Sequence, residues 1–110
     1  MIVVDADQES SAANSPVSVT YAATSGVAHV IAGLAWSYSG TPTTGRLTIT
    51  VGTASPIATV FDIDIRAAGP DSIVFFVPLR FAVGQQVTIT LAAGASGVTG
   101  RLNVLGHWTE

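Results

Sequence analysis

The sequence predicts an all-β fold, either a sandwich or a barrel, built from about 7–8 strands in one domain. Apolar residues alternate with threonine along residues 47–51 and 87–91, which is the period of a strand with one buried face. Turn residues such as Gly, Pro, Ser and Asn recur at short, regular intervals between the alternating runs. No segment carries the 3.6-residue stripe of an amphipathic helix. Short strands joined by tight turns are therefore expected.

Composition excludes several classes of protein. The chain has 110 residues, enough for one core, and 48% of them are hydrophobic. It has no cysteine, so neither a disulfide framework nor a cysteine-based metal site is expected. No apolar run reaches the roughly 18 residues of a membrane span, and the N-terminus lacks the basic segment of a secretory signal. The net charge of −3 and four dispersed arginines argue against direct nucleic acid binding.

The predicted domain organisation is an N-terminal arm, residues 1–16, followed by a β-sandwich domain, residues 17–110. The arm is polar, without a helical stripe, and contributes an eighth strand only if it pairs with the sheet. Pro78 lies inside an apolar run, so its strand is expected to end there, lie at an edge or carry a bulge. The predicted strands are residues 17–23, 27–38, 46–52, 57–66, 72–77, 85–92 and 98–108.

Alternation assigns faces to three of these strands. In strand 57–66 the isoleucines and Phe61 are expected to face the core, with Asp62, Asp64 and Arg66 on the other side. Strand 27–38 is apolar on both faces, so we expect it to be central or covered by another subunit. In the last strand we expect Leu102, Val104, Gly106 and Trp108 to point inward and Arg101, Asn103, Leu105 and His107 outward.

Asp62 and Asp64 are the first candidates for chemistry. They share a strand face about 7 Å apart, within the roughly 6.5–9.5 Å that separates the carboxyl groups of inverting glycosidases. They could also bind calcium, as could Asp5 and Asp7, but neither pair lies in a glycine-turned loop that supplies more oxygens. We favour a solvated or subunit-facing stripe that continues to Arg66 on the same strand and has an arginine of a neighbouring strand as its partner.

The remaining motifs do not predict catalysis. His29 and His107 are too few for a zinc site without cysteines. No G-x-S-x-G elbow occurs, and the glycine-rich stretch 94–100 lacks the lysine and the helix of a phosphate loop. We therefore expect no enzyme, no cofactor and no metal. Four aromatic residues could form a sugar-stacking platform, but we favour core or subunit packing for them: Tyr21, Trp36, Tyr38 and Trp108.

A set of turns and apolar stretches resembles small β-sandwich structural proteins of tailed bacteriophages, which decorate or cement capsids or occur as modules of head and tail fibres. The stretches that carry this resemblance are residues 27–31, 36–39, 42–49, 68–70, 78–80 and 91–106. The resemblance implies a single antiparallel, jelly-roll-like β-sandwich that forms trimers on the capsid surface. It also implies an arm that reaches the major capsid protein, and no catalytic residue.

The composition gives self-association an independent reason. Monomeric β-proteins guard exposed strand edges with lysine, and this chain has none. The resemblance implies the expected function, a non-enzymatic virion protein, which is a capsid decoration or cement protein that binds and stabilises the assembled shell as an oligomer. The residues expected to contact partners are Asp5, Asp7, Glu9, Tyr38, Asp62, Asp64, Arg66 and Trp108.

Two alternatives stay open. A receptor- or carbohydrate-binding module of a tail or fibre is expected to have long and chemically varied loops, whereas the longest loop here, residues 39–45, is bland. A fragment of a larger pilus-like assembly would exchange its N-terminal arm as a donated strand.

Overall fold

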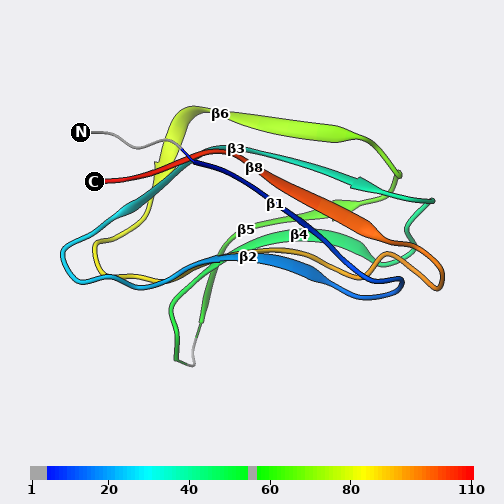
Figure 1. The fold of residues 1–110 in the computed structure, drawn as a ribbon, viewed down its shortest axis with the longest axis horizontal. Helices are drawn as coiled ribbons and strands as arrows, with labels where there is room; N and C mark the ends of the chain where they lie inside the picture. Colours follow the sequence, from blue (N-terminus) through cyan, green and yellow to red (C-terminus); the bar gives the residue numbers. More distant parts are fainter. Residues whose placement is uncertain (1–4, 55–56) are drawn as a thin grey trace.

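The computed structural model describes residues 5–54 and 57–110, with side chains from residue 7 onward. They form an elongated body, 42 × 29 × 21 Å, in which the described residues include no helix long and apolar enough to cross a membrane. The described residues form eight strands, whose arrangement is drawn in Figure 1. Their bounds are β1 Asp5–Ser10, β2 Val17–Tyr21, β3 His29–Tyr38, β4 Gly45–Val51, β5 Ala58–Ile65, β6 Asp71–Arg80, β7 Val87–Leu91 and β8 Gly100–Thr109.

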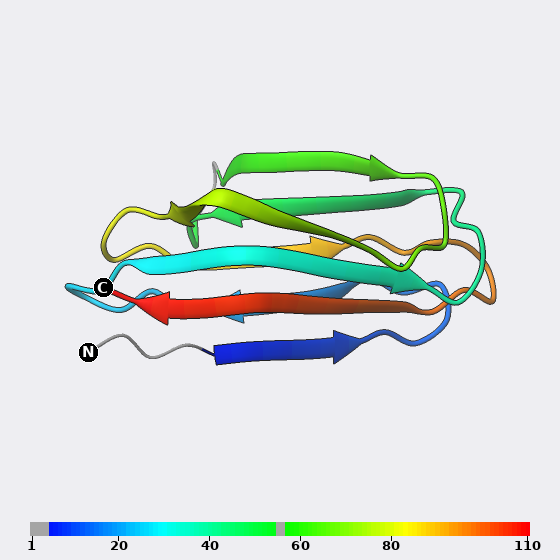
Figure 2. The ribbon, with the colours of Figure 1, turned by 90° about the horizontal axis from the view of Figure 1, so that it is seen from above.

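The strands form two four-stranded antiparallel sheets, in the orders β1-β8-β3-β6 and β2-β7-β4-β5. The first strand pairs with the last, the second with the seventh, the third with the sixth and the fourth with the fifth. This is a long hairpin rolled into two layers, the pairing of a jelly roll. Figure 2 shows β1 at one side of the sandwich and β5 and β6 at the opposite side. The predicted antiparallel β-sandwich is confirmed.

All seven predicted strands appear within a few residues of their expected bounds. The eighth, β1, comes from the segment that the sequence predicts as an arm, because residues 5–10 pair with β8. Pro78 lies in β6, which runs to Arg80 as an edge strand with a register shift. An edge position and a bulge are two of the outcomes expected for this proline.

The core fills the space between the two sheets. The sheet with β3 supplies its largest side chains, including Trp36 and Tyr38, which are each 6% exposed. The opposite sheet supplies the apolar halves of the threonine-alternating strands β4 and β7. The core side chains at 0% exposure include Ile31, Leu34, Leu47, Ile49, Val87, Ile89, Leu91 and Leu102.

Phe61, Ile63 and Ile65 of β5 pack on the core as predicted. The prediction that Ile57 also faces the core was wrong, because the extra residue Val60 shifts the register and Ile57 is 50% exposed. The prediction for the end of β8 was wrong. Gly106 adopts a φ of +84° beside a register shift against β1, which reverses the alternation beyond it. His107 is therefore buried between the sheets, whereas Trp108 pairs with Val30 and is half-buried.

β3 shows the same reversal. Ile31, which pairs with His107, and Leu34, which pairs with Val104, both join the core although they are three residues apart. Alternation along strand 27–38 predicts that Ile31 and Leu34 face opposite sides, and this prediction was wrong because the pairing is irregular between Ile31 and Gly33. The prediction that β3 is central is confirmed, since it lies between β8 and β6.

Candidate functional site

The outer face of the sheet formed by β2, β7, β4 and β5 carries hydroxyl groups. Threonines of neighbouring strands stand opposite one another, and the Ser18 Oγ lies 3.0 Å from the Thr90 Oγ1. Cross-strand hydroxyl pairs of this kind stabilise a sheet modestly. Two rows result, and their members are Ser18, Thr90 and Thr48 in one and Thr20, Thr88 and Thr50 in the other.

A charged pair borders this face at β5. The Arg46 Nε donates to the Asp62 Oδ1 at 2.7 Å, and the Arg46 Nη2 donates to the Asp62 Oδ2. The bond from Arg46 lowers the pKa of the Asp62 carboxyl, while Asp62 raises the pKa of Arg46. Arg46 of β4 is opposite Asp64 of β5 and reaches diagonally to Asp62, so this bidentate pair links β4 to the edge strand β5.

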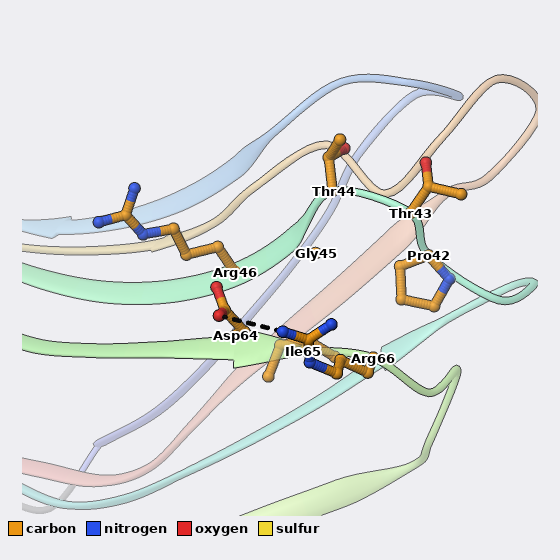
Figure 3. A pocket seen from close by; sticks show the side chains of 8 residues that line it. All are labelled: Pro42, Thr43, Thr44, Gly45, Arg46, Asp64, Ile65 and Arg66. Carbon is orange, nitrogen blue, oxygen red and sulfur yellow. Dashed lines mark ion pairs between the residues drawn. The ribbon is translucent and has the colours of Figure 1, made fainter.

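A polar hollow of about 340 Å³ lies where β5 ends beside the connection between β3 and β4. Figure 3 shows the Arg66 guanidinium directed at Asp64, with a nitrogen–oxygen distance of 3.7 Å. The opposite wall consists of Thr43 and Thr44, whose hydroxyls donate to the backbone carbonyls of Gly94 and Ala93. The hollow offers charge and hydrogen-bonding atoms to a small polar ligand.

A second hollow, of about 410 Å³, lies on the other side of Arg66, between the end of β5 and the start of β6. Asp71 and Ser72 line one wall, and Trp36 contributes to its apolar floor. The Arg66 side chain is 87% exposed. The end of β5 and the start of β6 thus lie at the same height along the strands. The exposed cation Arg66 and the exposed anion Asp71 line the same hollow there.

The side formed by the edge strands β5 and β6 is apolar. In β6, four residues, 75–78, lie opposite the single residue Ala32 of β3. This bulge displays Phe76, which is fully exposed, and Val77, which is 72% exposed. In β5, Val60 is an extra residue against β4 and is 54% exposed. Both edge strands therefore present apolar side chains where their pairing is irregular.

An apolar hollow of about 420 Å³ adjoins these residues. Ala58 and Val60 of β5 form one wall, and Leu79, Arg80 and the adjoining Phe81 form the other. Val74 of β6 and Ile57, which precedes β5, are also exposed, at 73% and 50%. We call Ile57, Val60, Val74, Phe76 and Val77 the apolar side. Exposed apolar surface that spans two strands is typical of a protein–protein contact.

A buried polar cluster lies at the opposite side of the sandwich and joins β1, β2, β3 and β8. The His107 ring stacks on Tyr21 at 3.7 Å between centroids, and its Nε2 lies 3.0 Å from the His29 Nδ1. The Tyr21 hydroxyl donates to the Asp7 Oδ2 at 2.6 Å. Sequence reasoning treated the two histidines as separate. The pairing of Ile31 with His107 places His29 beside His107, and the irregular pairing of β3 and β8 directs this face to the interior.

The predicted partner-contact residues do not form one site. Asp7 and Tyr38 are used internally, since the Tyr38 hydroxyl donates to the Ala92 carbonyl at 2.6 Å. Asp62, Asp64 and Arg66 lie together along β5, with Glu9 exposed on β1 and Trp108 half-buried on β8. Asp5 pairs with His107 through the backbone, and its side chain lies outside the described residues.

The favoured packing of Trp36 in the core is confirmed, and Tyr38 is buried there too, so the alternative aromatic platform does not assemble. Sequence reasoning also missed the apolar side. The run 73–77 signals an apolar strand, but the alternation gave no reason to expect its outward half to be apolar too.

The described residues include no group of three or more His, Asp or Glu side chains placed to hold a metal ion. The described residues offer apolar contact at one side and a polar hollow at the end of β5. Comparison with protein-family models and with curated proteins found no match.

Proposed function

We propose that this chain is a non-enzymatic structural protein of a virus particle, a capsid decoration or cement protein that binds and stabilises the assembled shell as a homo-oligomer. The observation that carries the proposal is the apolar side, where Phe76 and Val77 project from one edge strand and Val60 from the other. A small monomer that exposes this surface gains free energy by covering it.

The edges themselves support assembly. β5 and β6 end their sheets, and in the part of the chain that the structure describes no helix covers them. The chain also has no lysine to guard these edges, although the bulges and Pro78 interrupt simple strand addition. Side-chain packing is therefore a better means of contact than extension of a sheet. Repeated contacts on a shell multiply modest affinities through effective concentration.

The resemblance supports the remaining parts of the proposal. It implies a trimer, a place on the capsid surface and the major capsid protein as partner, and the eight-stranded jelly roll is an architecture found in viral capsid proteins. A ligand that binds only the assembled shell stabilises it by mass action. The protein is therefore expected to stabilise the assembled shell.

The test has two stages. Light scattering across a concentration series measures the mass of the purified chain, and thermal melting then measures whether it stabilises shells assembled from the major capsid protein of the same virus. Phe76→Asp is expected to reduce the mass and the shift in melting temperature, because it places a charge in the contact. Thr20→Asp places the same charge on the exposed, opposite edge and serves as the control. A concentration-independent monomer that leaves shells unchanged contradicts the proposal.

The polar hollow supports a second candidate, a receptor- or carbohydrate-binding module. Asp64 and Arg66 could hydrogen-bond sugar hydroxyls there. Glycan-array binding that is lost in Asp64→Ala and retained in Glu9→Ala would favour this function over the first.

A further inference from the structure

The structure also suggests how one copy contacts the next. We propose that the chain assembles through a head-to-tail contact in which β6 of one copy packs against β5 of the neighbouring copy, with the apolar side facing the axis of a closed ring. This inference rests on the self-association in the proposed function and goes beyond it by naming the two surfaces. The occupant of the apolar side is a second copy of the chain.

The first reason is that the apolar side has two unlike halves. β6 supplies projecting residues, Phe76 and Val77, and β5 supplies Val60 beside the hollow of about 420 Å³. Both halves lie on the same side of the sandwich (Figure 2). When one copy inserts its projecting half into the receiving half of the next copy, the contact is heterologous. Such contacts form a closed ring if the rotation between copies divides a full turn evenly.

The second reason is that the two halves lie at matching levels. The rings of Phe61 in β5 and Phe75 in β6 meet edge to face at 5.8 Å between centroids, so the middles of the two strands are level. If neighbouring copies are related by a rotation about an axis parallel to the strands, each residue has the same height along that axis in every copy. Phe76, which follows Phe75, therefore comes beside Val60 of the neighbouring copy.

The third reason is charge complementarity at the end of the same contact. Arg66 at the end of β5 and Asp71 at the start of β6 line one hollow and are level with each other. The Arg66 side chain is 87% exposed, and its ion pair with Asp64 is long, at 3.7 Å. The same rotation brings Asp71 to Arg66 of the neighbouring copy, an attraction at the rim of an apolar contact.

A two-fold arrangement makes a different prediction. Two copies of β6 placed antiparallel would bring Phe76 beside its own equivalent and Asp71 beside Arg80 of the neighbouring copy, because Asp71 and Arg80 are the two ends of the strand. Arg66 would have no role in that contact. The two arrangements can therefore be separated by asking which residues meet.

Cross-linking of introduced cysteines tests directly which residues of two copies meet, because the chain has no cysteine of its own. Val77→Cys is prepared with a mass tag and mixed with untagged Val60→Cys under mild oxidation, and the products are resolved on a non-reducing gel. We expect the mixed dimer to form on the order of 100-fold faster than with Val83→Cys in place of Val60→Cys, because docking raises the effective thiol concentration. Val83 is a matched control at 50% exposure in the β6–β7 connection.

Two other outcomes overturn the proposal. Rapid homodimer formation by Val77→Cys alone shows a two-fold contact, and rates no higher than those of the Val83→Cys control show that the apolar side does not meet a second copy. In either case the head-to-tail contact is wrong.

A charge swap gives an independent measurement. Asp71→Arg and Arg66→Asp are each expected to weaken self-association by about threefold to tenfold, measured by light scattering, and the double variant is expected to recover most of the loss. Recovery by Asp71→Arg combined with Arg80→Asp would instead support the two-fold arrangement. Loss of shell stabilisation with the mixed cross-link retained would contradict the decoration proposal and leave this contact standing.

Discussion

The Nδ1 of His29 and the Nε2 of His107 lie 3.0 Å apart in the interior, although 78 residues separate them in the chain. The His29 Nε2 lies 2.9 Å from the Ala22 carbonyl, which can only accept, so this nitrogen donates. In the neutral pair the His29 Nδ1 must then accept from the His107 Nε2. The two rings form a directed chain of hydrogen bonds that ends on the backbone after β2.

The first prediction follows from this chain. His107→Phe is expected to keep the stacking on Tyr21 but to leave the His29 Nδ1 without its donor, which costs about 1–3 kcal/mol of unfolding free energy. His29→Phe is expected to cost a similar amount. Urea denaturation of the single and double variants measures the coupling, and the double variant is expected to lose at least about 1 kcal/mol less than the two single losses added together. Strict additivity would show that the two rings do not interact.

The second prediction concerns the bulge that displays Phe76. A Cβ added at Gly33 would lie 2.7 Å from the Ile73 carbonyl oxygen, which is backbone and cannot move without displacing β6. Gly33→Ala is therefore expected to cost about 1–3 kcal/mol in urea denaturation. Gly40→Ala is the control, because its Cβ would meet only the Val98 side chain at 3.6 Å. Equal stabilities for the two variants would mean that β6 is not held closely against β3.

The third prediction concerns Tyr38. Its hydroxyl donates to the Ala92 carbonyl at 2.6 Å, and burial raises the pKa of Tyr38 above its usual value of 10.0. Tyr38→Phe keeps the ring and removes the donor, so we expect a loss of about 1–2 kcal/mol. Chemical denaturation followed by tryptophan fluorescence measures it, and an unchanged stability would show that water replaces the hydroxyl.

The fourth prediction is a pH dependence. The pKa of Asp62 in the folded chain lies below its ordinary value of 3.8, because Arg46 donates to the carboxylate. The pair therefore stabilises the fold above the unfolded pKa, and this contribution is lost as pH falls through the lower folded pKa. In thermal melts, Asp62→Asn and Arg46→Gln are both expected to show a smaller loss of stability between neutral and acidic pH. A pH profile identical to that of the parent chain would show that solvent screens this exposed pair completely.

The fifth prediction separates association from folding. Phe76 is fully exposed, so Phe76→Ser in dilute solution is expected to change the unfolding free energy by no more than about 0.5 kcal/mol. Phe61 packs against the core and Phe75, and Phe61→Ser is expected to cost about 2 kcal/mol. A large loss in Phe76→Ser at concentrations where the chain is monomeric would mean that this ring contributes to the fold itself.

Strand positions were predictable because local chemistry fixes them. Threonine alternation in β4 and β7 sets one buried face, and Pro78 restricts its strand to an edge or a bulge. The order of strands within each sheet is not a local property. The alternation gives no information on which strands pair, so β1 was assigned to an arm although it pairs with β8.

Alternation predicts that Asp62 and Asp64 of β5 share one face, away from the core, and the structure places both on that face. The histidine pair and the apolar side could not be found in this way. Both depend on bulges, and one extra residue reverses every later side chain of a strand. Gly106 with its positive φ and Gly33 against the Ile73 carbonyl mark the places where counting fails, but glycine alone does not identify a bulge in a sequence rich in turns.

The pairing of the first strand with the last places the described ends of the chain next to each other. Asp5 stands opposite His107, and Glu110 follows within three residues. A short peptide could therefore join the two ends, and new termini could be opened at the exposed Val83–Gln85 turn between β6 and β7 without cutting a strand. Such a circular permutant would keep all strand pairs of the two sheets. Its termini, and any peptide fused to them, would lie in the β6–β7 connection instead of beside β1 and β8.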